Sequence, residues 1–229
     1  MSTSDLLLTR MRAQADAWET SGDKRYIFLR CYSMMTANML TALEQGRFSD
    51  SRWVERLLQR FAEYYFDALG LYEQQHPFTP AVWRQVHDAS RHQRLHVLQH
   101  LLLGVNAHIN FDLALALCDG LRLEWPVMTA EIRQSREADH NLVNQIISET
   151  IDAVQDTVVE KASPAMALVD KLMGRVDEWL LSQLIASWRT EVWREACAML
   201  ECNNPEERDK MRQELEQKVM GRAVQLLGV

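Results

Sequence analysis

The chain has 229 residues, of which 47% are apolar and 25% charged, and this composition is typical of a folded globular protein and excludes a disordered chain. The net charge of −7 is spread along the sequence and repels phosphate backbones, so we expect no nucleic-acid partner. The chain shows no secretory signal and no run of about 18 uncharged apolar residues, and its cysteines are scattered, so we expect a cytoplasmic protein with free thiols and no membrane span.

The spacing of apolar residues predicts one all-α domain over residues 1–229, a bundle of about eight helices around a buried central helix. Only eight glycines and five prolines interrupt the chain, which favours long helices. In chain order, we expect helices over residues 3–20, 25–45, 52–73, 81–90, 91–119, 130–161, 164–200 and 205–227. The last helix is amphipathic and is expected at the periphery, where it favours partner binding or assembly into a homo-oligomer.

Local signals mark where several of these helices begin. Ser49 or Asp50 can cap the third helix. Thr79–Pro80 is interpreted as an N-cap followed by proline at the first helical position, and Asn204–Pro205 as the same signal before the last helix. A kink is expected near Gly174, because the helix that contains it is unusually long.

The stretch over residues 91–119 is the least polar in the chain, yet it holds four of the seven histidines. Apolar residues surround the predicted helix on every side, which is typical of a buried helix. Polar residues alternate between Asn106 and Asp112 as in a strand, but the leucine- and alanine-rich flanks favour a helix. Because an unpaired buried polar group costs about 1–3 kcal/mol, these side chains need partners.

His108 and Asp112 are four residues apart on this helix, so their side chains can reach one metal ion or each other. In the second case the carboxylate fixes the tautomer of the imidazole. Asn106 and Asn110 are also four apart, but they lie about 200° round the helix from the first pair. Two polar seams on one buried helix predict partners on both of its sides.

Three further histidines precede this pair at the same interval, His92, His96 and His100. They suggest a ladder of metal ligands, but successive members drift by about 40° round the helix. Because arginines flank His92, we favour solvated or interhelical histidines over coordination of a metal by all three.

A second polar group lies on the next long helix. His140 and Asn144 share a face that is flanked by apolar residues, and Asp139 precedes them. If this helix packs against the central one, the group joins His108 and Asp112 in one polar nest. Such a nest binds a metal, with zinc or iron as the candidates, or supplies acid and base groups. The alternative is that both sets only form hydrogen bonds between helices.

Two short motifs suggest a di-iron oxidase or oxygenase as an alternative. Glu73-x2-His76 and Glu137-x2-His140 both match the Glu-x-x-His of di-iron helix bundles. The motif arises easily by chance, and the proline after His76 moves that histidine away from helical geometry.

Arg189 and Trp193 are four residues apart on the long helix near the end of the chain. Arg189 can pair with Asp112 or bind an anionic ligand, and Trp193 can stack on the guanidinium. A surface salt bridge is the simpler interpretation.

The sequence LLLGVNAHINFDLALAL at residues 101–117 resembles the signature of an uncharacterised family of bacterial all-α proteins, whose core reads Gly-x-Asn-Ala-His-Ile-Asn-x-Asp-Leu. Further matches are RFAEYYFDAL at 60–69, DHNLVNQII at 139–147 and the Arg-x3-Trp at 189–193. The resemblance spans most of the chain, implies a bacterial all-α protein and picks out the polar residues of the central motif, which are Asn106, His108, Asn110 and Asp112. It implies no reaction.

A more distant resemblance is to zinc-dependent phospholipase C and P1-type nucleases, all-α enzymes that hold several zinc ions with His-x3-Asp and His-x3-Glu pairs. The chain has the His-x3-Asp pair. It has no His-x3-Glu pair and no N-terminal tryptophan ligand.

These patterns lead to the hypothesis of an enzyme that acts on a small molecule in a pocket between helices, with hydrolysis, with or without a metal, as the reaction. The catalytic or metal-binding candidates are His108, Asp112 and His140. The candidates for ligand binding are Asn106, Asn110, Asn144, Arg189 and Trp193. The alternative is a non-catalytic binding or interaction protein in which His108 and Asp112 are structural, and it predicts no cavity beside His108 and a large exposed apolar patch.

Overall fold

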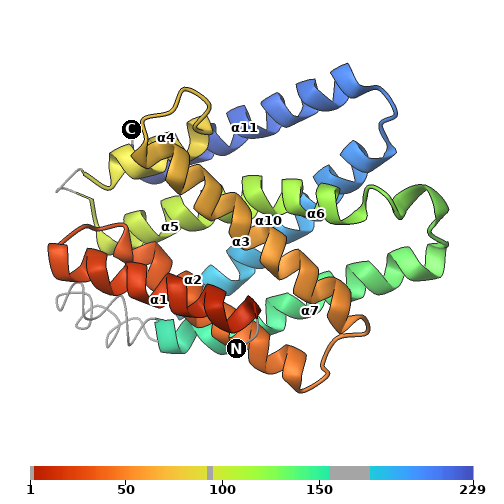
Figure 1. Ribbon diagram of the computed structural model, residues 1–229, viewed down its shortest axis with the longest axis horizontal. Coiled ribbons are helices and arrows are strands. Elements are labelled where there is room, and N and C mark those ends of the chain that lie inside the picture. The colour runs from red at the N-terminus through yellow and green to blue at the C-terminus, as the bar shows by residue number, and fades with distance from the viewer. Residues whose placement is uncertain (1–2, 92–94, 155–175, 229) are drawn as a thin grey trace.

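The computed structural model describes residues 3–91, 95–154 and 176–228, and within these ranges the chain is helical and has no strand (Figure 1). The elements are α1 (Thr3–Ser21), α2 (Tyr26–Glu44), α3 (Ser51–Glu73), α4 (Ala81–Ala89), α5 (Val97–Ala107), the π-helical turn η1 (His108–Asp112), α6 (Leu113–Leu121), the short 3₁₀ turn η2 (Trp125–Val127), α7 (Ala130–Val154), α10 (Val176–Glu201) and α11 (Pro205–Leu227). The all-α prediction of about eight helices is confirmed, because α5, η1 and α6 form one continuous helix. The predicted continuation of α7 to residue 161, the predicted start of α10 at 164 and the kink at Gly174 lie outside the described residues.

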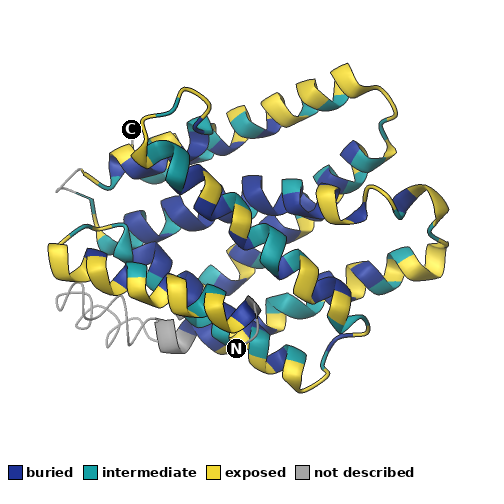
Figure 2. Cartoon of the chain, viewed as in Figure 1, coloured by how far each residue is buried: buried dark blue, intermediate teal, exposed yellow. Residues whose placement is uncertain are grey.

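The continuous helix α5–η1–α6 runs through the middle of the bundle, and most of its residues are buried (Figures 1 and 2). It packs against α2, α3 and α4 and also against α10 and α11, so both of its polar seams meet neighbours. By length and composition, Val97–Leu121 is the one described helix that could cross a membrane, but 83% of its most apolar window is buried inside the protein. That burial is what the core helix of a bundle shows, and it confirms the prediction of a buried central helix.

Two of the three predicted cap sites are confirmed. The Asp50 side chain accepts a hydrogen bond from the backbone N–H of Trp53 at 3.0 Å, and Asn204 accepts one from Glu206 at 3.0 Å. These bonds satisfy helix N–H groups that have no partner within the helix, which is why these residues start α3 and α11.

The predicted start of α4 at residue 81 is confirmed, but the predicted cap is wrong. The helix begins at Ala81 after an extended Pro80, and the Thr79 hydroxyl donates to the carbonyl of His76 instead of capping the helix. The free N–H of Ala81 is satisfied from a distant part of the chain, because the carboxylate of Glu216 on α11 accepts it at 2.7 Å. A tertiary contact therefore replaces the local cap.

The central helix begins later than the sequence predicts, at Val97 instead of Arg91. His96 has an extended backbone and acts as the N-cap, and the side chain of Gln99 accepts its backbone N–H at 3.0 Å. His96 therefore precedes the helix, whereas His100 lies on it, so the two residues do not form the predicted ladder on one helix face. His92 lies outside the described residues.

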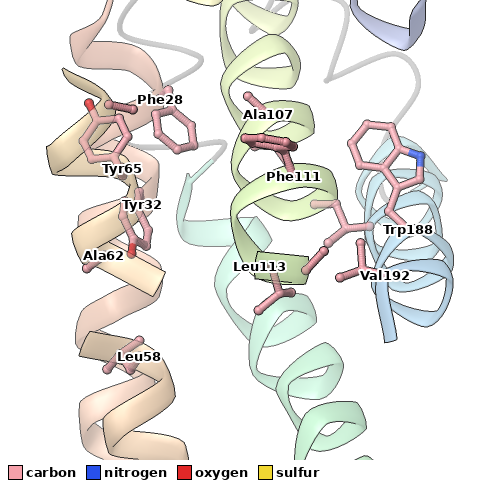
Figure 3. Close-up of a cluster of buried hydrophobic side chains, with 14 of the residues drawn as sticks. Phe28, Tyr32, Leu58, Ala62, Tyr65, Ala107, Phe111, Leu113, Trp188 and Val192 are labelled. Carbon is pink, nitrogen blue, oxygen red and sulfur yellow. The ribbon is translucent and has the colours of Figure 1, made fainter. Parts of the chain in front are cut away.

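An aromatic cluster fills the space between the central helix and the α2–α3 side of the bundle. Phe28, Tyr32 and Tyr65 come from α2 and α3 and face the central helix, whereas Trp188 and Val192 of α10 lie on its other side (Figure 3). The central helix thus separates two apolar layers, and the candidate site lies where it meets the first.

Candidate functional site

The π-helical turn at the middle of the central helix carries His108 and Asp112. The backbone N–H of Leu113 bonds the carbonyl of His108, five residues back, which widens the helix by one residue. The Nδ1 atom of His108 lies 2.9 Å from Oδ2 of Asp112. The indole N–H of Trp83, on α4, donates to both oxygens of the Asp112 carboxylate at 3.0 Å. The predicted pairing of His108 with Asp112 is therefore present, and the hydrogen bonds from Trp83 fix the position of the Asp112 carboxylate.

The imidazole of His108 is enclosed by aromatic rings. The Phe61 ring stacks on it at a centroid distance of 3.6 Å and an interplanar angle of 8°, and the Tyr32 ring meets it at 4.3 Å. Phe28 completes this wall in an edge-to-face arrangement, with its ring centroid 5.7 Å from that of the imidazole. The residue is only 3% exposed, and its second nitrogen, Nε2, has no hydrogen-bond partner among the described residues.

Burial decides the protonation of the pair. It raises the pKa of Asp112 well above its usual range, which the hydrogen bond from Trp83 opposes, and it lowers the pKa of His108 well below its usual range. Both shifts favour a pair without net charge, which holds two protons. One proton lies between Nδ1 and Oδ2, and the other must then lie on Nε2. The Nε2–H group is therefore a buried donor without an acceptor.

His108 lies on the wall of a cavity of about 140 Å³ between α2, α3, the central helix, α7 and α10. Most of the lining is aliphatic or aromatic. Tyr32 and Thr36 of α2 line the same cavity, and their hydroxyls are also buried without a partner in the described part of the chain. Trp53 is a fourth lining residue of this kind, because its indole N–H is also buried without a described partner. Each such group costs about 1–3 kcal/mol of desolvation, so four of them in the lining of one largely apolar cavity call for an explanation.

A second polar cluster lies on the same cavity wall, where α7 meets α10. The guanidinium of Arg189 donates from Nε to Oδ1 of Asn144 at 2.8 Å and from Nη2 to the backbone carbonyl of His140 at 2.7 Å. The Nε2 atom of His140 lies 3.0 Å from the backbone carbonyl of Arg189, and Nδ1 lies 3.3 Å from Nη2. The ring therefore carries its proton on Nε2 and turns its lone pair to the guanidinium.

The charges of this cluster are strongly affected by burial. Burial lowers the pKa of Arg189 to about 9. Burial, together with the neighbouring Arg189, lowers the pKa of His140 well below its usual range. Because both ring nitrogens of His140 are in use and the ring stays neutral, its geometry gives it a positioning role for Arg189.

The other predicted residues of the nest have separate partners. The carboxylate of Asp139 accepts the backbone N–H groups of Ser49 and Asp50 at 2.7 and 2.9 Å, and so ties α7 to the start of α3. Trp193 packs on the ring of His140, with a centroid distance of 5.0 Å. It was expected to stack on the guanidinium of Arg189 instead. Thus the cavity wall brings together His108, Asp139, His140 and Arg189, but their hydrogen bonds form two clusters instead of one nest.

The second seam of the central helix faces α11. Asn106 donates to the backbone carbonyl of Val219 at 3.0 Å and accepts from Asn110 at 2.9 Å. Neither asparagine lines the cavity. The predicted role of both residues in ligand binding stays a prediction, and the geometry gives them a role in docking α11.

The remaining metal candidates do not come together. Glu73 is exposed at the end of α3, where it pairs with Arg25, and Glu137 is exposed on α7. His100 is buried at a separate small cavity beside Lys24. In the described ranges, no group of three or more His, Cys, Asp and Glu side chains is arranged to hold a metal ion. Zinc or iron binding stays a prediction.

The sequence does not single out four residues that shape the site, namely Tyr32, Thr36, Phe61 and Trp83. Each lies on an amphipathic helix at an ordinary core position, so periodicity marks it only as buried. What distinguishes them is their position around His108, Asp112 and the cavity, which depends on how α2, α3 and α4 pack.

The comparisons with known proteins identify a family. A family model described as a family of unknown function (DUF5995) matches residues 5–229, so the chain belongs to that family. No curated protein and no solved structure matches the chain.

Proposed function

We propose that this member of the family binds a small, largely apolar molecule in the cavity beside His108 and acts on it by proton transfer. One observation carries the proposal: His108, Tyr32 and Thr36 line one largely apolar cavity, and each has a buried polar atom without a described partner, which is Nε2 in His108 and the hydroxyl in the other two. A folded protein gains stability by removing such groups, so their presence favours a ligand that uses them.

In this proposal, His108 is the acid–base group. Its Nε2–H donates a proton to an oxygen of the bound molecule, and the proton between Nδ1 and Oδ2 of Asp112 keeps the ring protonated. Asp112 and Trp83 act as positioning residues, because they fix the ring and do not reach the cavity. The Tyr32 and Thr36 hydroxyls orient the same polar end of the ligand.

Hydrolysis of an ester is the reaction that this arrangement supports best. Water attacks the acyl carbon, the bond to the leaving oxygen breaks, and that oxygen takes the proton from Nε2 of His108. A proton of the attacking water then returns to Nε2, so one water is consumed in each turnover. The hydroxyls of Tyr32 and Thr36 would stabilise the negative charge that develops on the carbonyl oxygen.

The proposal routes no step through a metal. Among the described lining residues, Nδ1 of His108 faces Asp112, both nitrogens of His140 are engaged, and the oxygens of Asp139 accept backbone N–H groups. Nε2 of His108 and the thiol of Cys31 remain as possible ligands, whereas a catalytic zinc needs three.

The second candidate is a binding protein that holds the same ligand without chemistry. The nearly continuous apolar lining of the cavity favours it, since such a lining suits retention of an apolar molecule. The earlier alternative of a purely structural pair predicts no cavity at His108, and the cavity of about 140 Å³ there argues against it.

Two variants test the proposal, His108→Gln and, as its control, His100→Gln. His100 is also buried on the central helix but lies at another cavity. Against a panel of short- and medium-chain acyl esters, we expect the wild type and His100→Gln to be active and folded His108→Gln to lose at least about 100-fold in kcat/KM. Binding of 1-octanol without hydrolysis would support the second candidate. A protein that neither binds nor hydrolyses would refute both.

A further inference from the structure

We propose that Arg189 is the subsite for a carboxylate, so that the ligand of the cavity is a small apolar molecule with one carboxylate group. This inference rests on the proposed function, because it names the class of molecule that the same cavity takes.

Arg189 differs from other arginines of the protein in its partners. It is 5% exposed, and its described hydrogen bonds run to Oδ1 of Asn144 and to atoms of His140, all of which are neutral acceptors. Among the residues whose side chains the structure describes, 4–91, 95–151 and 180–228, no carboxylate forms an ion pair with its guanidinium. The positive charge is thus buried with dipoles around it and without a described counter-charge.

Arg136 provides the comparison. It is the other buried arginine among the described residues, at 8% exposure, and it forms ion pairs with Asp50 and Glu124. The buried Arg136 lies outside the cavity lining and has carboxylate partners. Arg189 lines the cavity and has no described carboxylate partner.

The carboxylate of Asp139 on α7 does not compensate the charge of Arg189. Asp139 lines the same cavity, but its two oxygens are taken by the backbone N–H groups of Ser49 and Asp50. His140, which does contact the guanidinium, is neutral. The lowered pKa of Arg189 agrees with this shortage of negative charge, since desolvation is its only cause.

The geometry selects a carboxylate among anions. Asn144 and His140 hold the guanidinium from Nε and Nη2, so the plane of the fork is fixed before any ligand binds. These bonds leave Nη1 to donate to a ligand, and a carboxylate carries a single charge, which one arginine neutralises. A phosphate monoester would bring a second charge into an apolar cavity that has no further cation on its described wall.

The cavity limits the size of the apolar part. Its volume of about 140 Å³ is close to that of an apolar cavity of about 150 Å³ known to hold benzene. We therefore expect a body of roughly six to eight carbons. A medium-chain fatty acid or an aromatic acid has these dimensions.

The test compares octanoate with 1-octanol, which has the same chain and no charge, by isothermal titration calorimetry at pH 7.5. We expect the wild type to bind octanoate at least about tenfold more tightly, the factor expected for a hydrogen bond to a charged group. Arg189→Gln should lose this preference and keep its affinity for 1-octanol. Arg189→Lys retains the charge and should keep part of the preference.

Arg136→Gln is the matched control, because it removes a buried arginine outside the cavity lining and should leave the preference unchanged. Equal binding of octanoate and 1-octanol by the wild type overturns the inference and leaves the proposed function standing. Failure of both molecules to bind overturns the proposed function as well. The comparison in the wild type decides the question even if Arg189→Gln does not fold.

Discussion

Gly104 of the central helix and Phe28 of α2 are in such close contact that a Cβ atom on residue 104 would lie 2.4 Å from Cγ of the Phe28 ring. No residue with a side chain fits there unless the ring moves. The same ring forms one wall of the enclosure of His108. A glycine one turn before His108 therefore sets the distance between α2 and the central helix at the site.

Gly104→Ala should accordingly destabilise the protein. Displacing a buried ring costs about 1–3 kcal/mol, which exceeds the gain of about 1 kcal/mol from alanine's higher helix propensity. Gly70→Ala is the control, because a Cβ on that α3 residue meets no atom within 4 Å. Urea unfolding should show a loss for the first variant and no loss for the second. Equal stability of the two would contradict the close contact.

Thr36→Val should stabilise the ligand-free protein. The substitution keeps the shape of the side chain and removes a buried hydroxyl that has no described partner, which relieves up to about 1–3 kcal/mol. Thr150→Val, on the same cavity wall, should have the opposite effect. The Thr150 hydroxyl accepts from Asn38 at 2.8 Å and donates to the Ile146 carbonyl at 2.6 Å, so its loss leaves partners unpaired.

Thermal unfolding of the two threonine variants measures this contrast directly. The account further expects Thr36→Val to bind 1-octanol less tightly than the wild type does, despite its higher stability. A Thr36→Val protein that is less stable than the wild type would mean that the hydroxyl already has a partner.

Asp139→Asn should cost about 1–3 kcal/mol of stability. The carboxylate accepts two backbone N–H groups, from Ser49 and Asp50, and an amide turns one of its two acceptors into a donor. Glu137→Gln makes the same chemical change at an exposed position of α7 and serves as the control. Chemical denaturation should show a lower free energy of unfolding for Asp139→Asn than for Glu137→Gln. If Asp139→Asn were as stable as the wild type, the carboxylate would not hold α7 and α3 together.

His87 should make the fold sensitive to acid. Burial, with Arg25 and Arg91 nearby and Asp23 opposing them, lowers the pKa of His87 from 6.5 to about 3. Between these two pH values the unfolded chain binds a proton at residue 87 that the folded protein does not bind. The contribution of His87 to the free energy of unfolding is therefore intact above pH 6.5 and decreases as the pH is lowered. From pH 7.5 to pH 5 the loss is about 2 kcal/mol.

His87→Phe keeps a ring between Trp83 and Tyr72 and removes this titration. The stability lost between pH 7.5 and pH 5 should shrink by about 2 kcal/mol in the variant. Part of the loss will remain, because His108 and His140 also have lowered pKa values. An unchanged pH profile would show that His87 is protonated, or paired, in the folded protein.

The sequence predicts the central helix and its two seams well because both follow from local periodicity. Asn106 with Asn110, and His108 with Asp112, pair at the predicted interval and face opposite neighbours. The π-helical turn at His108–Asp112 has no signal in the sequence, because apolar residues surround this helix on every side and a shift by one residue leaves that pattern unchanged. The predicted cap of α4 was wrong because the side chain that satisfies the first N–H group, that of Glu216, lies 135 residues away in the sequence.

The cavity could not be predicted, since it arises from how several helices pack. Arg189 and His140 were both recognised as candidates, but their mutual contact joins two helices whose register the sequence does not specify. The sequence also gives no reason to expect that Arg189 would lack a carboxylate. Whether Arg189 has a carboxylate partner depends on how the helices pack and not on any sequence motif.

The central claim is that Nε2 of His108 is a donor that meets a ligand in the cavity. The most direct measurement is the ¹⁵N chemical shift of the histidine side chains during titration with octanoate and, separately, 1-octanol, with His108→Gln providing the assignment. The account predicts a protonated Nε2 whose resonance moves as either molecule binds, while those of His87, outside the cavity lining, stay in place. A His108 signal that does not change when the protein is saturated, or the lack of any binding, would contradict it.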